Sequence, residues 1–295
     1  MTPKAAILSL LRSPAFVVCV LLLAALRPLN AQKPSPGPGL QVFAGPGDAR
    51  LGSTARLAVP PGYVFLDADS TRLFLKARGE FVSGQEVGFL TNTNQTWSVL
   101  FIFDQSGYVK DDEKDKLDAS KLLESIKQGV ALGNRERQRR GTPPVEVVGW
   151  ELPPKYDPAA HNLEWAIRGI CQGQPMVNYN TRLLGRSGVM EVILVVAPER
   201  LAQTLPVFRK VLAGYAYQPG QTYAEYRAGD KVAKYGLGAL VVGVAAKPGL
   251  PAWAAALSKE AWALILVAVV ILVVLAARAP FFRKLFRQGA PRAQG

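Results

Sequence analysis

The sequence predicts an α+β domain with a largely antiparallel sheet and two or more packed helices, followed by one C-terminal transmembrane helix. Short strand-like runs follow one another with hairpin-like connections, and helical patterns are inserted between groups of strands. A charge-free apolar run stands near the C-terminus. With 49% apolar residues in 295, the chain can also bury a sizeable core.

The expected strands are short and apolar or alternating. Trp97–Phe103 is typical of a buried strand, and Asn162–Gly169 places Leu163, Trp165 and Ile167 on one face. The full set is Gly62–Ala68 and Thr71–Ala77, joined as a hairpin through Asp69 and Ser70, then Trp97–Phe103, Val145–Leu152, Asn162–Gly169, and a hairpin over Met176–Val196 with Arg186 and Ser187 at its tip.

Two helices are expected between these strands. Asp118 is suited to cap the first helix, which carries an apolar stripe and ends before Gly141. The stripe consists of Leu122, Ile126 and Val130. The second helix is expected from about Pro198 to Leu212, with a kink at Pro206.

The N-terminal residues 1–31 are predicted to be a signal peptide. Lys4 and Arg12 precede an apolar run, Ala15–Leu26, which is short for a membrane span and typical of a signal-peptide core. Ala31 is the expected cleavage position, and the alternative is a leader retained as a short anchor. Residues 32–44 are rich in proline and glycine and are predicted to be a linker.

The other end of the chain predicts a single membrane span. Ala261–Ala277 carries no charge and would cross the lipid bilayer as a helix about 25 Å long. The basic residues 278–295 are then a cytoplasmic tail. We therefore expect a single-pass protein of the inner membrane, with an extracytoplasmic α+β domain, residues 45–230, in the periplasm or outside the cell.

Residues 231–257 are predicted to be an apolar helix and connector, packed on the domain or lying at the membrane interface. The apolar run Tyr235–Ala246 has only a dozen residues, which is short for a second span.

The net charge of +13 gives no evidence for a nucleic-acid partner. The leader contributes +3 and the tail +5, which leaves only +5 for the domain between them. That value is mild for a domain of this size. We expect no nucleic acid among the partners.

The stretch from Gly149 to Trp165 contains the only histidine, His161, and Cys171 follows closely. Six polar or aromatic residues on neighbouring segments could line a ligand groove: Tyr156, Asp157, His161, Asn178, Tyr179 and Arg186. The alternative is an envelope hydrolase or thiol enzyme that uses Cys171 and His161. We interpret Cys171 as a buried apolar residue and expect no catalytic residues, no cofactor and no metal site.

The sequence resembles a family of uncharacterised bacterial membrane-anchored proteins that share a domain of unknown function. The blocks that carry the resemblance are "ARLGSTARLAVPPGYVFLDADSTRLFL", "QSGYVKDDEKDKLDASKLLESI", "VVGWELPPKYDPAAHNLEWAI", "VNYNTRLLGRSGVMEV" and "DKVAKYGLGALVVG". The resemblance implies an exported domain with an anchor near the C-terminus and assigns no catalytic residue. It also implies that the run beginning at Tyr235 belongs with the domain.

These observations together predict a membrane-anchored envelope protein of unknown biochemical activity. We expect a non-catalytic binding or interaction domain outside the cytoplasm, with an envelope protein as its partner.

Overall fold

The computed structural model describes residues 40–243 except positions 79, 81 and 140. Within those residues, no helix combines the length and apolar character needed to cross a bilayer. The predicted signal peptide, most of the predicted linker, the predicted span at Ala261–Ala277 and the basic tail lie outside the described residues.

The described residues form strands and helices in mixed order. The strands are β1 Val42–Ala44, β2 Gly47–Leu51, β3 Ala55–Val59, β4 Tyr63–Leu66, β5 Glu86–Asn92, β6 Trp97–Asp104, β7 Val145–Asp157, β8 Asn162–Cys171, β9 Gln174–Leu184, β10 Val189–Val196 and β11 Tyr215–Tyr217. The α-helices are α2 Ala68–Ala77, α3 Ala119–Arg139, α4 Leu201–Leu212 and α5 Leu237–Val242, and the short 3-10 turns are η1 Lys114–Lys116, η2 Pro198–Arg200 and η3 Tyr223–Glu225.

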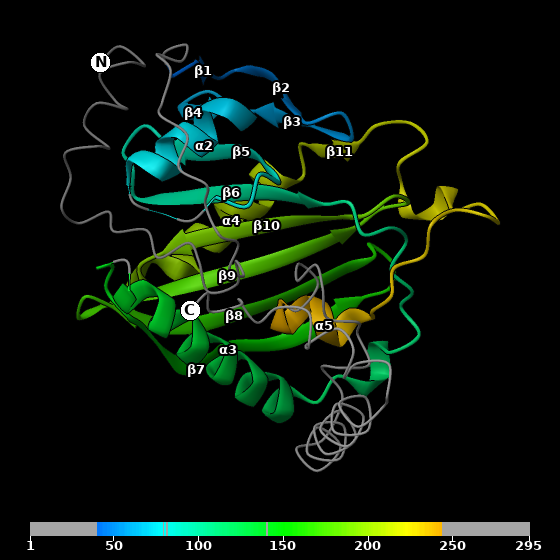
Figure 1. Cartoon of the computed structure of the whole chain (residues 1–295). Helices are drawn as coiled ribbons and strands as arrows, with labels where there is room; N and C mark the ends of the chain where they lie inside the picture. Colours follow the sequence, from blue (N-terminus) through cyan, green and yellow to red (C-terminus); the bar gives the residue numbers. More distant parts are fainter. Residues whose placement is uncertain (1–39, 79, 81, 140, 244–295) are drawn as a thin grey trace, which may run out of the picture. The chain divides into compact units, whose positions relative to one another are not determined.

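The strands build two antiparallel sheets (Figure 1). The larger sheet has eight strands in the order β1-β4-β5-β6-β10-β9-β8-β7, and the smaller one has the order β11-β3-β2. Every paired strand runs antiparallel to its neighbour. The predicted α+β class with a largely antiparallel sheet and packed helices is confirmed.

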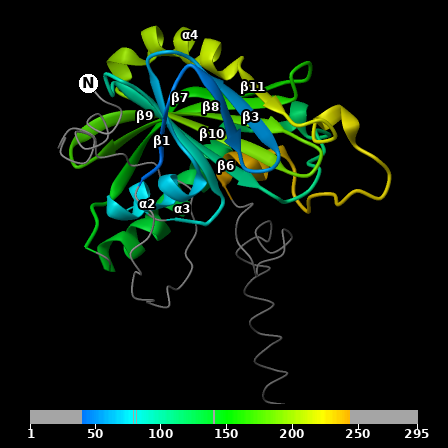
Figure 2. The ribbon, with the colours of Figure 1, turned by 90° about the horizontal axis from the view of Figure 1, so that it is seen from above.

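Helices cover both faces of the large sheet. Figure 2 shows α4 on one side and α2 and α3 on the other. Because side chains alternate along a strand, each face has its own core. The α4 side buries Val177, Val192 and Phe208, whereas the α3 side buries Trp165 and Leu240.

The predicted strand Thr71–Ala77 is wrong, because the structure has helix α2 there. The side chain of Asp67 accepts a hydrogen bond from the Ser70 backbone N–H at 2.8 Å and caps the helix. Thr71, Phe74 and Leu75 then share the buried face at helical spacing. The aromatic and apolar run suggested a strand, but the cap and the helical period decide the local structure.

The remaining predicted elements lie close to their expected positions. Asp118 caps α3, where its Oδ1 accepts from the backbone N–H groups of Ser120 and Lys121. Helix α4 continues through Pro206. Strand β1, Val42–Ala44, falls in the segment predicted to be linker and pairs with β4. Helix α5 lies inside the predicted apolar segment and packs against the core beneath α3.

Candidate functional site

Four chain segments meet at one end of the large sheet, which we call the loop end. They are the β7–β8 turn before Asn162, the β9–β10 turn at residues 185–188, the chain after β6, and residues 218–235. The register places Leu184, Val189 and Asp104 side by side at this end. The backbone N–H of Leu184 donates to the carbonyl oxygen of His161 at 3.1 Å, which joins the two turns.

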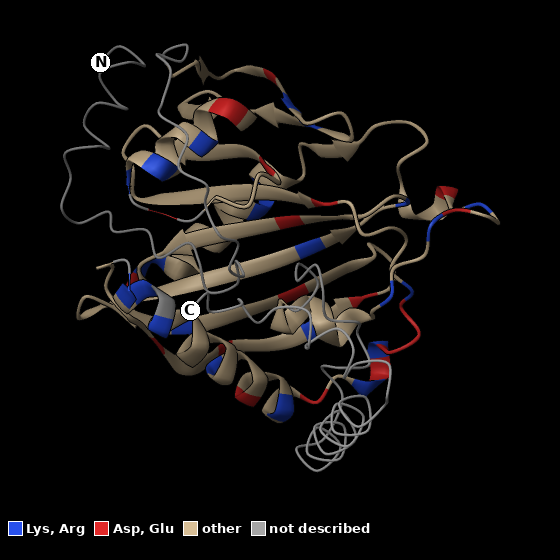
Figure 3. Ribbon diagram, in the orientation of Figure 1, with Lys and Arg blue, Asp and Glu red and all other residues tan. Residues whose placement is uncertain are grey.

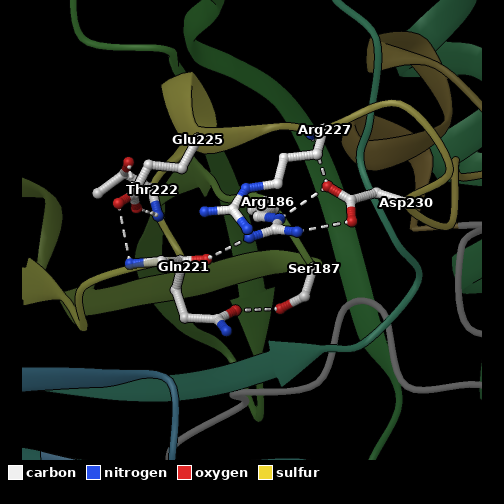
Figure 4. A network of polar contacts seen from close by, with 8 residues as sticks. Arg186, Ser187, Gln221, Thr222, Glu225, Arg227 and Asp230 are labelled. Carbon is white, nitrogen blue, oxygen red and sulfur yellow. Dashed lines mark hydrogen bonds and ion pairs between the residues drawn. The ribbon is translucent and has the colours of Figure 1, made fainter.

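Arg186, at the tip of the β9–β10 hairpin, makes a two-pronged ion pair with Asp230 (Figure 4). Its Nε lies 2.7 Å from Oδ2 and its Nη2 lies 2.8 Å from Oδ1. The two parallel hydrogen bonds hold the guanidinium and the carboxylate in one relative orientation, in addition to pairing their charges. The hydrogen bonds from Arg186 lower the pKa of Asp230 to about 2, so the pair persists at neutral pH.

Residues 221–225 complete the same network (Figure 4). The Ser187 hydroxyl donates to the side-chain oxygen of Gln221 at 2.6 Å. Thr222 and Glu225 form a capping box, in which Glu225 accepts from the Thr222 backbone and hydroxyl. The loop that follows β11 is therefore tied both to itself and to the hairpin tip.

Four rings stack in sequence beside this loop, and we call them the aromatic stack. Tyr226 contacts Tyr108 with ring centroids 4.2 Å apart, Tyr108 contacts Tyr223 at 4.4 Å, and Tyr223 contacts His161 at 4.3 Å. Tyr226 is 38% exposed, whereas Tyr223 is buried. Tyr108 and His161, on either side of Tyr223, are half-buried. The stack is therefore exposed at Tyr226 and most deeply buried at Tyr223.

His161 is held at the end of the stack opposite Tyr226 by a second set of contacts. Its Nδ1 lies 3.3 Å from the Tyr156 hydroxyl, which donates to Asp111 Oδ2 at 3.0 Å. Burial and the hydrogen bond to Asp111 raise the pKa of Tyr156, so this phenol remains a donor. His161 also has a positive φ of 50°, a conformation uncommon for residues other than glycine.

The six residues of the predicted groove do not all come together. Tyr156 and His161 touch, and Arg186 lies at the same loop end. Asp157 also lies there, but its carboxylate accepts from the backbone N–H groups of Ala159 and Ala160 and shapes the turn.

Asn178 and Tyr179 do not belong to the loop end. They are consecutive residues of β9, so they face opposite sides of the sheet, and at about 3.3 Å per residue they lie about 20 Å and about 17 Å from Leu184. Both are buried. The Tyr179 hydroxyl donates to Glu164 at 2.6 Å, and burial is the main cause that raises the pKa of Tyr179 to about 12. The structure therefore does not bring these two residues of the predicted groove to the loop end.

The alternative pair of Cys171 and His161 is not brought together by the structure. His161 immediately precedes β8 and Cys171 ends it, so about 30 Å of extended strand separates them. Cys171 is 2% exposed and packs in the core beneath α3. A nucleophile and its base must lie within hydrogen-bond reach, and these residues do not.

A pocket of about 420 Å³ lies between the start of α3 and α5. Among its lining residues, Asp118 caps α3 and also pairs with Lys121 at 3.3 Å. These polar groups are engaged in local structure, so we assign no ligand to the pocket. In the described part of the chain, no three His, Cys, Asp or Glu side chains gather as metal ligands.

The stack and a partly buried ionic pair were missed by sequence reasoning. The rings of the stack come from segments far apart in the chain, and only the spacing of Tyr223 and Tyr226 gave a local signal. This pair joins the buried Arg182 to the partly exposed Glu191. Each is the only charged residue in its strand of the predicted hairpin, so the hairpin register could have paired them.

Comparison with known proteins gives a family match and distant structural likenesses. The model of a family described as "Protein of unknown function (DUF2167)" matches residues 44–270. No curated protein matches the sequence. The solution structure of cyanobacterial PsbP (CyanoP) from Synechocystis has 12% identity and a TM-score of 0.37, covering 64% of this chain and 98% of its own.

Two further solved structures are similar to this chain with lower TM-scores. The Ran-binding protein Mog1p from Saccharomyces cerevisiae has 12% identity and a TM-score of 0.32, with 60% of this chain and 95% of that chain covered. The immunity protein TplEi from Pseudomonas aeruginosa has 10% identity and a TM-score of 0.24, with 63% and 78% covered.

Proposed function

This chain belongs to the DUF2167 family of proteins of unknown function, and from its own contacts we propose a non-catalytic binding role. In this proposal it is a membrane-anchored envelope protein whose folded domain lies outside the cytoplasm. The domain binds a protein partner through the loop end, with Tyr226 at the centre of the contact.

The observation that carries the proposal is the exposed end of a braced aromatic stack. Tyr226 is 38% exposed, and the Tyr108 ring packs against its ring with the two centroids 4.2 Å apart. Tyrosine is enriched at the centres of protein interfaces because it supplies a large rigid surface and a polar tip. A contact surface that is already ordered loses less conformational entropy when a partner binds.

The loop contacts support the same interpretation. Arg186 and Asp230 fix the chain on one side of Tyr226, and the Thr222–Glu225 capping box fixes it on the other. Binding residues are often found on loops that a rigid scaffold positions. The large sheet is such a scaffold for the loop end.

The location rests on the two ends of the sequence. The leader with its short apolar core supports export, and the uncharged run Ala261–Ala277 with a basic flank supports one span with a cytoplasmic tail. A partner would then be met in the envelope.

The test is affinity capture of the full-length protein from its own membranes after crosslinking in cells. We compare Tyr226→Ala with Phe43→Ala, a matched control on edge strand β1 whose exposure, 37%, is nearly the same. We expect a specific envelope protein to be captured by the parent and the control and to be lost or strongly reduced with Tyr226→Ala. Truncating a central interface aromatic typically costs more than about 1 kcal/mol of binding.

Two results would count against the proposal. Equal capture by the parent and Tyr226→Ala would show that the stack is not the contact surface. Turnover of an envelope substrate by the purified protein would contradict the non-catalytic role.

A further inference from the structure

A charged pair lies in the sheet close to the loop end, with its cation buried and its Glu191 side chain 18% exposed. Arg182 of β9 is 1% exposed and stands opposite Glu191 of β10, with Nη2 and Oε2 3.0 Å apart. The guanidinium lies 4.7 Å from the centre of the Trp165 ring. Among the described residues, neither Nε nor Nη1 of Arg182 has a hydrogen-bond acceptor. The buried positive charge of Arg182 is therefore stabilised mainly by the negative charges of neighbouring carboxylates.

A second carboxylate, Asp104, adjoins this pair at the end of β6. It is 6% exposed, and the Tyr235 hydroxyl donates a hydrogen bond to its Oδ2. The positive charges that face Asp104 are Arg182 and Lys231, and Lys231 is exposed with its Nζ bound to the Gln105 carbonyl. Two carboxylates thus share one buried cation.

Tyr235 connects this cluster to the segment 231–242. The backbone of that segment runs beside Tyr108, which donates to the carbonyl oxygen of Lys231 and accepts from the N–H of Ala233, both at 2.8 Å. Helix α5 follows directly, with Leu237, Leu240 and Val241 buried. The Tyr235 hydroxyl therefore links this segment to the charged residues of the sheet.

The protonation state of the carboxylates depends on this arrangement. Burial is the largest cause that raises the pKa of Asp104 and of Glu191, and it outweighs the nearby positive charge of Arg182. Glu191 and Asp104 also face each other, which favours a proton on one of them. A carboxyl whose pKa is raised in the folded state binds protons on folding, so its contribution to stability is lost as pH rises.

We propose that Asp104, Glu191 and Arg182 form a proton-dependent latch that holds residues 231–242 on the sheet more firmly as the pH falls. When this segment separates from the sheet, both carboxyls gain water and their pKa values return toward the ordinary range. Docking therefore takes up protons. The inference is independent of the proposed partner, because the latch is defined by contacts within the chain.

The measurement is backbone hydrogen exchange of the full-length protein in detergent, read as protection factors for residues 231–242 from about pH 5.5 to about pH 8.5. Protection factors remove the intrinsic pH dependence of exchange. We expect protection to fall as pH rises, by up to about tenfold per pH unit for each proton taken up on docking. Constant protection across this range would overturn the latch.

Asp104→Asn tests which group carries the effect. The amide keeps an acceptor for Tyr235 and leaves Glu191 and Arg182 as a balanced pair, so protection should stay high and depend less on pH. Asp112→Asn is the matched control at an exposed carboxylate and should leave the pH dependence unchanged. An unaltered pH dependence in Asp104→Asn would overturn the assignment.

Tyr235→Phe supplies a second variant in case Asp104→Asn fails to fold. It removes only the hydroxyl and retains the ring, so the loss of protection should be confined to residues 231–242. The loss should be largest at high pH, where Asp104 is ionised and accepts the stronger hydrogen bond. Protection equal to that of the parent in Tyr235→Phe across the pH range would show that the hydroxyl does not hold the segment.

Discussion

Glu80 faces two positive charges, yet its pKa is raised to about 7. Burial disfavours its charged form, and this effect outweighs the attraction of Arg137 and Arg78. The folded state therefore binds a proton that the unfolded state releases at lower pH. The stabilisation is fully present below the unfolded value, near 4.5, and is lost as pH rises through about 7.

We predict that the free energy of unfolding decreases as pH rises from about 5 to about 7, between the unfolded and folded pKa values of Glu80, which contributes up to about 1.4 kcal/mol per pH unit. Glu80→Gln should reduce this slope, since the amide does not titrate. Urea unfolding at the two ends of this pH range measures the slope, and Asp69→Asn is the control at an exposed carboxylate. An identical slope in Glu80→Gln and the parent would contradict the prediction.

Only part of the candidate site could be predicted at the level of single residues. Tyr156 and His161 are close in sequence and flank one turn, so their contact followed from local reasoning. Asn178 and Tyr179 failed because neighbouring strand residues face opposite sides. The other residues of the stack are brought together only by the tertiary fold, so local sequence reasoning could not find them. The Tyr223 hydroxyl, for example, donates to the carbonyl of Val109, 114 positions away.

At the level of elements, periodicity predicted most of the sheet but not α2. Val189 to Val196 and Trp97 to Asp104 are buried along nearly their whole length, so apolar runs sufficed to identify them as strands. Residues 71–77 mix β-branched, aromatic and charged side chains, and a short run of this kind is ambiguous between strand and helix. The cap at Asp67 resolves the ambiguity, and it lies just before the run.

We predict that this cap contributes measurably to stability. Asp67→Ala removes the acceptor for the Ser70 N–H and should lower the free energy of unfolding by about 1 kcal/mol. Asp67→Ser retains a capping oxygen and should stay close to the parent value. Urea unfolding of the three proteins decides the point, and equal destabilisation by both substitutions would show that capping is not the cause.

At the scale of the whole molecule, the buried charges lie beneath the same segments that build the loop end. Tyr108 belongs to the aromatic stack and also pairs through its backbone with the segment that carries Tyr235. Asp104 lies four residues before Tyr108 on the same chain segment. A change in the protonation of the latch therefore acts on backbone that supports the proposed contact surface, although each proposal is tested separately.

The membrane topology is the broadest prediction, and it depends on charges at the two ends of the sequence. The leader supports export, whereas Arg283 and Lys284 beside the uncharged run Ala261–Ala277 favour a cytoplasmic tail. A reporter that is active only outside the cytoplasm should work when fused near Arg227 and fail when fused after Gln288. A reporter active only in the cytoplasm should give the opposite pattern. Activity of the first reporter at Gln288 with silence at Arg227 would reverse the topology and remove the envelope from the proposed function.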